Sequence, residues 1–318
     1  MPRDRGASPA EWPGLDGADE RRFAMVVIGD VGIEVRATLP DVRFADLDAD
    51  RLSYAPARAV VAGTAVNLAR SATRCFRRVD VLAKVGDDDF TPVIRRELER
   101  LGAGDLLCVE PGAPNGVSVM LRDQGGGDGG GGGRGVRLLV VRDDPPARRL
   151  TGRDVAASAA RIADADVLAV DGYSLLSPVS RDALHAAARL ARDAGTRVAF
   201  DLVPHDVDAR LPADGVLPTL ALADLVISEA PTLARLLGRP GPTTASEVRA
   251  LPPVLDDAVP GSPLWLLRFG PTSLERVLAH QRGRPPIEYS SGYRHGVERA
   301  GFGDRLAASE LYWWLSED

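Results

Sequence analysis

The 318-residue sequence has few of the residues on which several protein classes depend. Its two cysteines, Cys75 and Cys108, are too few for a disulfide framework and show no metal-ligand spacing, which is typical of buried thiols in a reducing cytoplasm. Lys84 is the only lysine, and the net charge of −6 gives no basic field for nucleic acid. No apolar run reaches the length of a membrane span, and the first twenty residues lack the apolar core of a signal peptide. These absences predict a cytoplasmic protein with no nucleic-acid or membrane partner.

The length and the remaining composition fit one large α/β unit. A chain of 318 residues with 45% hydrophobic content has ample material for a core. Residues 1–22, rich in Pro and Asp, are predicted to be a disordered tail, and residues 23–318 a single domain. From residue 151 onward, apolar strands alternate with helical segments, such as a helix over 178–194 before a strand over 197–201. That alternation predicts a parallel sheet with right-handed connections.

The most informative stretch is Gly301-Phe302-Gly303-Asp304, followed by a run rich in Ala and Leu that predicts a helix beginning near Asp304. Two glycines let the backbone turn tightly, so the turn opens onto a helix N-terminus, which is a natural site for a phosphate. A carboxylate there can accept the proton of a hydroxyl that attacks the phosphate. Aspartate is also a favoured helix N-cap, so this stretch alone leaves both interpretations open.

The turn resembles the G-A-G-D signature of ribokinase-like (PfkB-type) carbohydrate kinases. The resemblance implies that Asp304 is the catalytic base and that Gly301, Phe302 and Gly303 form the anion hole. It also implies a three-layer α/β/α sandwich with a mostly parallel central sheet and a small β-sheet lid. The implied cofactors are ATP and Mg²⁺, and the implied partner is a small polyol substrate. Further motifs follow in the family's order between residues 24 and 315.

The first of these motifs follows an apolar run over residues 24–28 that ends at Asp30. Ligands in open α/β sheets gather at strand ends, so Asp30 is either a substrate contact or a turn residue. The segment resembles the family's G-D-x-N-x-D, with Gly32 in place of the Asn and Glu34 in place of the last Asp. The resemblance implies that Asp30 and Glu34 face the substrate, and the two changes indicate that the substrate need not be a common sugar.

The second motif is the segment from Gly63 to Asn67, which resembles G-G-x-x-x-N-x-A. Gly63 would let a substrate approach the backbone, and Asn67 has both a donor and an acceptor for a sugar hydroxyl. The alternative is that Asn67 only caps the helix or faces solvent. A further acidic run, Asp87-Asp88-Asp89, favours capping of the next helix over a metal site, because adjacent carboxylates diverge in direction.

Alternating apolar and polar residues within about 31–48 and 108–147 predict the strands of the lid. Residues 125–135, nearly all glycine, are predicted to be a flexible loop between two lid strands. A lid suits a kinase because it excludes the water that would otherwise accept the phosphoryl group. Exposed lid strands need to be covered, and a homodimer through the lid is one way to cover them.

The motifs that the resemblance places near the nucleotide are altered. Ser228 and Pro231 stand at the Asn and the Glu of the family's N-x-x-E motif, and Ser273 stands at the second glycine of K-x-G-x-x-G. The sequence ends at Asp318, where the family continues into a helix beside the adenine, so a shorter adenine wall is expected. The residues with an implied role in nucleotide binding are Ser228, Arg268, Gly270 and Ser273.

Two functions follow from this pattern. The first is an ATP-dependent phosphotransferase acting on a hydroxyl of a small sugar, cyclitol or nucleoside-like substrate. The second is a kinase-fold protein that has lost phosphotransfer and serves as a ligand-binding or regulatory protein, or carries different chemistry. The glycine turn with Asp304 favours the first function, and the altered positions Ser228, Pro231 and Ser273 favour the second. Binding of ATP discriminates between them.

Overall fold

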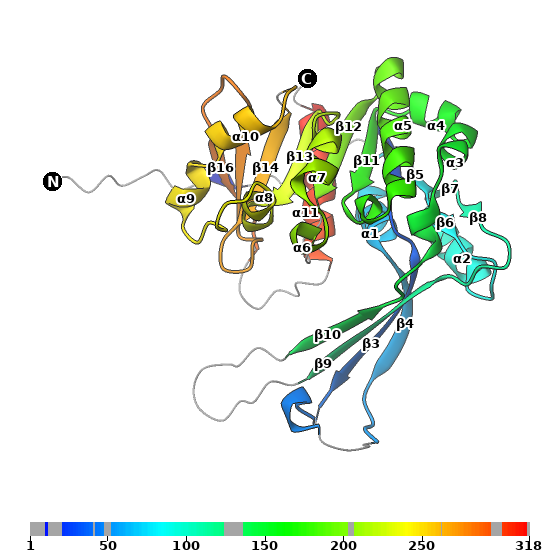
Figure 1. The fold of residues 1–318 in the computed structure, drawn as a ribbon. Coiled ribbons are helices and arrows are strands. Elements are labelled where there is room, and N and C mark those ends of the chain that lie inside the picture. Colours follow the sequence, from blue (N-terminus) through cyan, green and yellow to red (C-terminus); the bar gives the residue numbers. More distant parts are fainter. Residues whose placement is uncertain are drawn as a thin grey trace.

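The computed structural model describes residues 10–11, 21–40, 42–47, 52–123, 136–202, 207–261, 263–293 and 301–316. They form an α/β body and a small sheet that projects from it (Figure 1). The glycine-rich loop predicted at 125–135 lies outside the described residues. No helix in the described part of the chain is long and apolar enough to cross a membrane.

The body is built on a ten-stranded sheet that is mostly parallel, as predicted. Among its described strands only β15 runs against its neighbours. Both β2 and β11 are buried along their whole length, as expected of strands whose two faces are covered. In sheet order the strands are β1 (Ala10–Glu11), β16 (Ile287–Ser290), β15 (Arg276–His280), β14 (Leu264–Phe269), β13 (Leu225–Glu229), β12 (Arg197–Leu202), β11 (Val167–Asp171), β2 (Ala24–Ile28), β5 (Arg78–Leu82) and β7 (Gly104–Asp105).

Helices cover both faces of this sheet, which gives three layers (Figure 1). One apolar core, with Leu98 and Tyr312, lies against α1 (Thr64–Ala72), α2 (Thr91–Leu101) and α11 (Phe302–Ser316). The other core, with Leu184 and Leu233, lies on the opposite face. The remaining helices are α3 (Gly152–Ala157), α4 (Ala159–Ala163), α5 (Pro178–Ala194), α6 (Val207–Arg210), α7 (Ala213–Leu220), α8 (Ala230–Leu236), α9 (Ala245–Arg249) and α10 (Pro252–Ala258), with short 3₁₀ turns η1 (Phe44–Asp46), η2 (Pro146–Arg149) and η3 (Tyr173–Leu176).

The projecting sheet is the predicted lid, but its limits differ from the prediction. Its order is β10 (Arg137–Val141), β9 (Gly116–Asp123), β3 (Gly32–Leu39) and β4 (Ala57–Ala62). The prediction omitted β4, which lies outside both lid segments and pairs antiparallel with β3. It also began the second segment too early, because Cys108–Val109 forms β8 and pairs with β6 (Lys84–Val85) beside the body.

The predicted disordered tail is also interrupted. Ala10 and Glu11 form β1, which pairs in parallel with Tyr289 and Ser290 of β16. The prediction therefore does not hold for these two residues, and residues 1–9 and 12–20 lie outside the described chain.

Candidate active site

Charged side chains gather at the carboxyl end of the parallel strands, on the face that α1 and α11 cover. Asp171 and Asp201 are direct partners on β11 and β12, and Glu229 is the partner of Arg268 on β13 and β14. Side chains on a strand alternate between faces, so this register puts all four on the face of the buried Ile227. The carboxyl edge is where open α/β sheets bind ligands.

The predicted catalytic turn reaches this edge at the start of α11. Gly301 has a φ of 73°, which favours glycine, and its carbonyl accepts a hydrogen bond from the backbone N–H of Arg305 at 3.1 Å. The ring of Phe302 packs edge-on against Tyr293, with 4.7 Å between centroids. A Cβ at Gly303 would lie 3.7 Å from Nη1 of Arg268. The helix therefore begins two residues earlier than predicted and opens beside Arg268.

Asp304 lies in the first turn of α11 in a setting suited to proton transfer. Burial and the neighbouring Asp201 carboxylate raise the pKa of Asp304 to about 6, while Arg268 and Arg70 act in the opposite direction. A base with a pKa near the working pH is ionised and still holds a transferred proton well. The first amides of a helix have no intrahelical acceptor, so the same turn offers donors to an anion.

Arg268 is held by a buried ion pair. Its Nη2 lies 2.5 Å from Oε2 of Glu310, which follows Asp304 further along α11, and both side chains are almost fully inaccessible. Burial alone would lower the pKa of Arg268, but the carboxylates of Glu310 and Asp201 keep it above its ordinary value. The Arg268 guanidinium is therefore held, in its charged form, beside the turn at the start of α11.

The residues predicted to bind the substrate are organised around Asp171, which sequence reasoning did not single out as functional. One of its carboxylate oxygens accepts hydrogen bonds from the Asp30 amide at 3.1 Å and from the Thr64 hydroxyl, and the other accepts from Ser174 Oγ at 2.6 Å. Burial and Asp171 raise the pKa of Asp30 to about 6. Asp171 thus joins the ends of β2 and β11 to the start of α1.

Gly63 is required by a close backbone approach. Its φ is 109°, and a Cβ there would meet the Asp30 carbonyl oxygen at 2.2 Å. That carbonyl accepts from the amide of Ala65 at 3.2 Å. Gly63 and Asp30, both predicted substrate contacts, are thus neighbours in the structure.

The other two predicted substrate contacts are engaged by arginines. Oδ1 of Asn67 accepts a hydrogen bond from Arg70 at 2.8 Å. The carboxylate of Glu34 forms an ion pair with Arg36 on the same face of β3.

The residues with a predicted role in nucleotide binding lie around the ends of β13 and β14. Ser228 is buried, and its hydroxyl donates to the carbonyl of Glu229 at 3.1 Å. Gly270 has a φ of 118°, and Ser273 has a φ of 60°, the only positive value found for a residue other than glycine in the described chain. Hydrogen bonds from Thr272 to the Glu275 carboxylate brace this loop. The loop keeps a glycine-like backbone at Ser273.

No group of three or more His, Cys, Asp or Glu residues in the described part of the chain is arranged to hold a metal. The carboxylates of Asp88 and Asp87 accept amide hydrogen bonds from Asn115 and Gly112, in the loop before β9. This role differs from the predicted capping of the next helix, because the N-cap of α2 is Phe90, which makes no side-chain capping bond. Mg²⁺ in a phosphotransferase needs only one or two carboxylates besides the phosphates. Asp201 and Glu229 at the strand ends fit that requirement, and the start of α11 fits a phosphate.

Sequence reasoning missed Asp171 and Glu310 as parts of the site. Asp171 and Gly172 follow an apolar strand, just as Gly29 and Asp30 follow another. This repeated pairing of Asp with Gly at a strand end could have identified Asp171. Glu310 lies inside an apolar helix and is fully buried, but the sequence holds no sign that its partner is Arg268.

The fold is that of the ribokinase-like kinases. Ribokinase from Giardia lamblia superimposes with a TM-score of 0.72 at 17% identity, over 93% of this chain and 84% of that one. Adenosine kinase from Sinorhizobium meliloti gives a TM-score of 0.71 at 16% identity over 92% and 88%. A ribokinase II of E. coli, described as putative and solved with ATP and Mg²⁺, gives 0.69 at 16% identity over 93% and 87%.

The sequence profile described as pfkB family carbohydrate kinase matches residues 25–258. The chain therefore belongs to the pfkB family of carbohydrate kinases. No curated protein matches the sequence. The matched range includes Asp30, Gly63 and Asn67 and ends before Asp304.

Proposed function

We propose that the protein is an ATP-dependent kinase that phosphorylates a hydroxyl of a small sugar, cyclitol or nucleoside-like molecule. The observation that carries the proposal is the position of Asp304 at the N-terminus of α11, beside Arg268 and Asp201. A base, an anion-binding turn and a fixed positive charge are what phosphoryl transfer asks of a protein.

Each residue has a distinct role in this proposal. Asp304 accepts the proton of the acceptor hydroxyl. At the same time the hydroxyl oxygen forms a bond to the γ-phosphorus of ATP, and the bond from that phosphorus to the departing ADP breaks. The amides of Gly301, Phe302 and Gly303 stabilise the developing charge on the phosphoryl oxygens. ATP supplies the phosphoryl group, and Mg²⁺ offsets its charge. The acceptor is held by Asp30, Glu34, Gly63 and Asn67, and the nucleotide lies against Ser228, Arg268, Gly270 and Ser273.

The test is the variant Asp304→Asn, which keeps size and polarity but removes the base. We expect turnover to fall by at least about 10³-fold, with nucleotide binding retained. Asp193→Asn, on the exposed face of α5, is the matched control and should behave as the wild type. Near wild-type turnover by Asp304→Asn would disprove the assignment.

A second candidate is a kinase-fold protein that binds a ligand without transferring phosphate. Pro231 favours it, because it stands in the first turn of α8 where the family's motif has a glutamate. Calorimetric titration of ATP with Mg²⁺ separates the two functions. Saturable binding supports the kinase, and no binding at millimolar ATP supports the second candidate.

The lid also supports a proposal about assembly. Leu138 and Val140 point to the same side of β10 and are exposed by 46% and 54%. Apolar side chains on an exposed sheet need a cover, and a second copy of the lid would supply it. Sedimentation velocity should then show a homodimer that Leu138→Ser/Val140→Ser converts to a monomer.

A further inference from the structure

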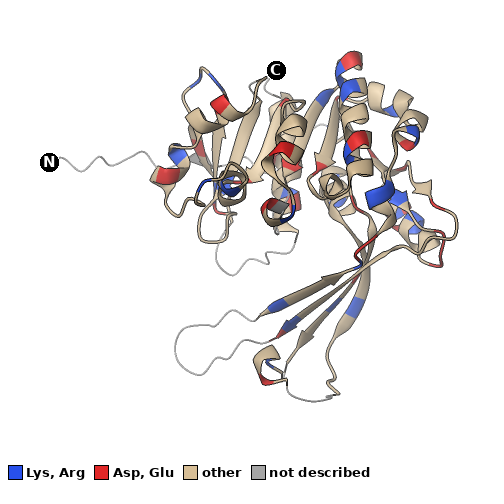
Figure 2. Ribbon diagram, in the orientation of Figure 1, with Lys and Arg blue, Asp and Glu red and all other residues tan. Residues whose placement is uncertain are grey.

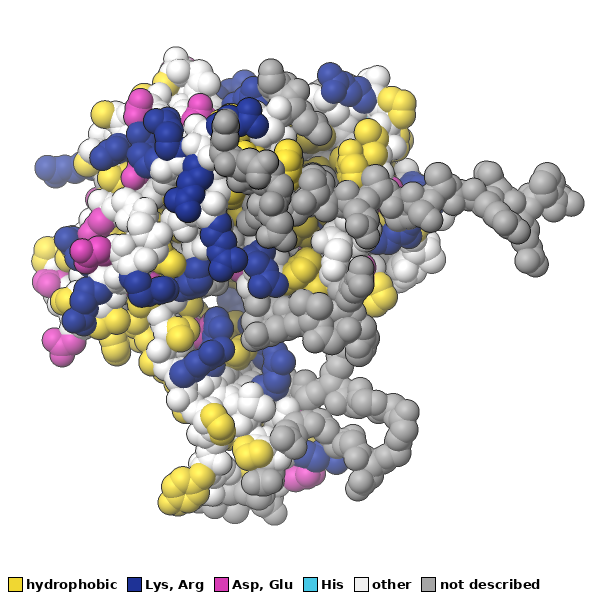
Figure 3. All heavy atoms as spheres, turned by 180° about the vertical axis from the view of Figure 1, so that it is seen from behind, with side chains coloured by type: hydrophobic (Ala, Val, Ile, Leu, Met, Phe, Trp, Pro, Cys, Tyr) yellow, Lys and Arg dark blue, Asp and Glu magenta, His cyan; other side chains and the backbone are white. Residues whose placement is uncertain are grey.

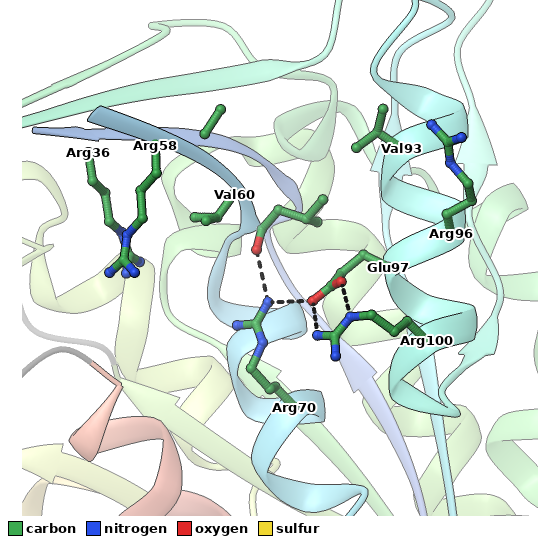
Figure 4. Close-up of a pocket in the computed structure, with 10 residues that line it drawn as sticks. Arg36, Arg58, Val60, Arg70, Val93, Arg96, Glu97 and Arg100 are labelled. Atoms are coloured by element: carbon green, nitrogen blue, oxygen red, sulfur yellow. Dashed lines mark hydrogen bonds and ion pairs between the residues drawn. The ribbon is translucent and has the colours of Figure 1, made fainter. Parts of the chain in front are cut away.

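A cavity of about 620 Å³ lies between the lid and the helices α1 and α2, a volume typical of small-molecule sites. Its lining is dominated by arginines from four elements, β3, β4, α1 and α2 (Figure 4). Seen from behind, basic side chains gather where the body meets the lid (Figure 3). The charged residues of the lining are Arg36, Arg58, Arg70, Arg96, Arg100 and Glu97.

The acidic groups in and beside this cavity do not neutralise it. Glu97 accepts hydrogen bonds from Arg100 at 2.7 Å and from Arg70 at 3.1 Å, and these bonds hold the pKa of Glu97 below its ordinary value. Glu34 pairs with Arg36. Within the described residues, Arg58 and Arg96 have no acidic side chain within ion-pair distance. Five arginines therefore face two carboxylates, and the cavity carries a net positive charge.

The lid itself concentrates positive charge on one face. Arg36 is directly opposite Arg58 on β3 and β4, and Arg122 is directly opposite Arg137 on β9 and β10. The register of β3 and β9 puts all four, with Glu34, on the same face, and Figure 2 shows basic positions along the lid strands. Like charges directly opposite one another destabilise a sheet. An anionic ligand would remove that penalty.

This face of the lid looks toward the catalytic residues. The charge of Arg137 acts on the hydroxyl of Tyr173, which follows the carboxyl end of β11. On the body, Arg70 donates to Asn67, and its charge acts on the carboxyl of Asp304. The helices α1 and α11 pack side by side. Arg70 thus joins the lining of the cavity to Asn67, on the helix that packs against α11.

We propose that the acceptor substrate is an anionic polyol, carrying a phosphate monoester or a carboxylate that Arg36, Arg58 and Arg70 bind while its hydroxyl is presented to Asp304. Only the presentation of the hydroxyl to Asp304 rests on the proposed function; the binding of the anion by the arginines does not. Guanidinium groups suit both anions, because their paired N–H donors match two oxygens of either group.

The experiment is calorimetric titration of the wild-type protein, without nucleotide, with matched probes: ribose and ribose 5-phosphate, fructose and fructose 6-phosphate, glucose and gluconate. We expect an anionic member to bind at least about 10-fold more tightly than its neutral partner, with an affinity that falls as salt is raised. Arg58→Gln should weaken that binding by roughly 10-fold or more. The control Arg284→Gln changes an exposed arginine in the turn before β16, toward the opposite edge of the sheet, and should change nothing.

Phosphoryl transfer to each probe is then measured with ATP and Mg²⁺. Tight binding of a phosphate or carboxylate probe that depends on Arg58 supports the inference, and the preferred probe identifies the anion. The same binding without transfer would leave the inference standing and contradict the kinase function. Equal affinities within every pair, or binding unaffected by Arg58→Gln, would overturn the inference even if a neutral polyol is phosphorylated.

Discussion

The residues proposed to bind the substrate (the substrate side) and those proposed to bind the nucleotide (the nucleotide side) preserve the family pattern in different ways. On the substrate side the motif residues Asp30 and Gly63 are present, and they are locked together by Asp171 and by a backbone approach that only glycine allows. On the nucleotide side Ser273 and Pro231 replace motif residues, although Ser273 still has the backbone of a glycine. Shape therefore persists where the side chains have changed, so a replaced motif residue does not by itself mean a lost loop.

The largest effect is expected for the buried pair of Arg268 and Glu310, because this pair lies between the two sides and supports both. Arg268→Met leaves Glu310 buried without its partner and should reduce the free energy of unfolding by about 3–5 kcal/mol. Urea denaturation measures the loss. The double variant Arg268→Met/Glu310→Met should recover most of it, since an apolar pair of similar size needs no neutralisation. A single variant as stable as the wild type would show that the pair is not formed.

Gly63→Ala tests the locking of the substrate side. The new Cβ meets the Asp30 carbonyl oxygen and requires a strained φ, so we expect a loss of roughly 2–5 kcal/mol in the free energy of unfolding. Gly152→Ala is the matched control, because nothing lies within 4 Å of a Cβ there and the residue begins α3. Equal stability of the two variants would contradict the close approach.

The pH dependence of activity and of stability tests Asp304 and Asp30, the two carboxyls with a raised pKa. Asp304 and Asp30 both have pKa values raised to about 6, so kcat/KM should rise through pH 6 to a plateau as the base ionises. The free energy of unfolding changes in the opposite direction and falls as the pH rises. A raised pKa favours the protonated carboxyl in the folded state, so this contribution is complete below about pH 4 and is lost as pH rises through 6.

Asp304→Asn cannot titrate and should therefore be more stable than the wild type above pH 6, by about 3 kcal/mol, with the difference vanishing near pH 4. Thermal unfolding across this range measures the difference. A constant difference at all pH values would exclude ionisation of Asp304 as its cause.

The smallest expected effect concerns the nucleotide side. Ser273→Gly restores the family's glycine at a φ of 60° and should raise the free energy of unfolding by about 0.5–1 kcal/mol. Urea denaturation measures the gain, and calorimetry with ATP shows whether the restored glycine also strengthens binding. Destabilisation by this change would mean that the hydroxyl of Ser273 has a role of its own.

Much of the architecture could be read from the sequence because local signals specify it. The apolar run before Asp30 and the helix over 178–194 lie where they were predicted, since periodicity and flanking glycines mark both. The strand β4 was missed because Ala57–Ala62 shows little alternation and is recognised only by its pairing with β3. The partner of Glu310 was missed for the same reason, as a contact between residues 42 positions apart leaves no local pattern.

At the root of the lid, Gly32 of β3 pairs with Gly116 of β9, and a Cβ on Gly32 would lie 2.5 Å from the carbonyl oxygen of Gly116. A side chain at Gly32 therefore does not fit this packing, whereas the outer positions of β3 are mostly half-buried or exposed. The charged residues of the lid face lie away from this glycine pair, so replacing them should leave the attachment of the lid intact. The residues that would set the substrate range are thus different from those that attach the lid. Protein design can change the charged lid face while keeping the pair of Gly32 and Gly116.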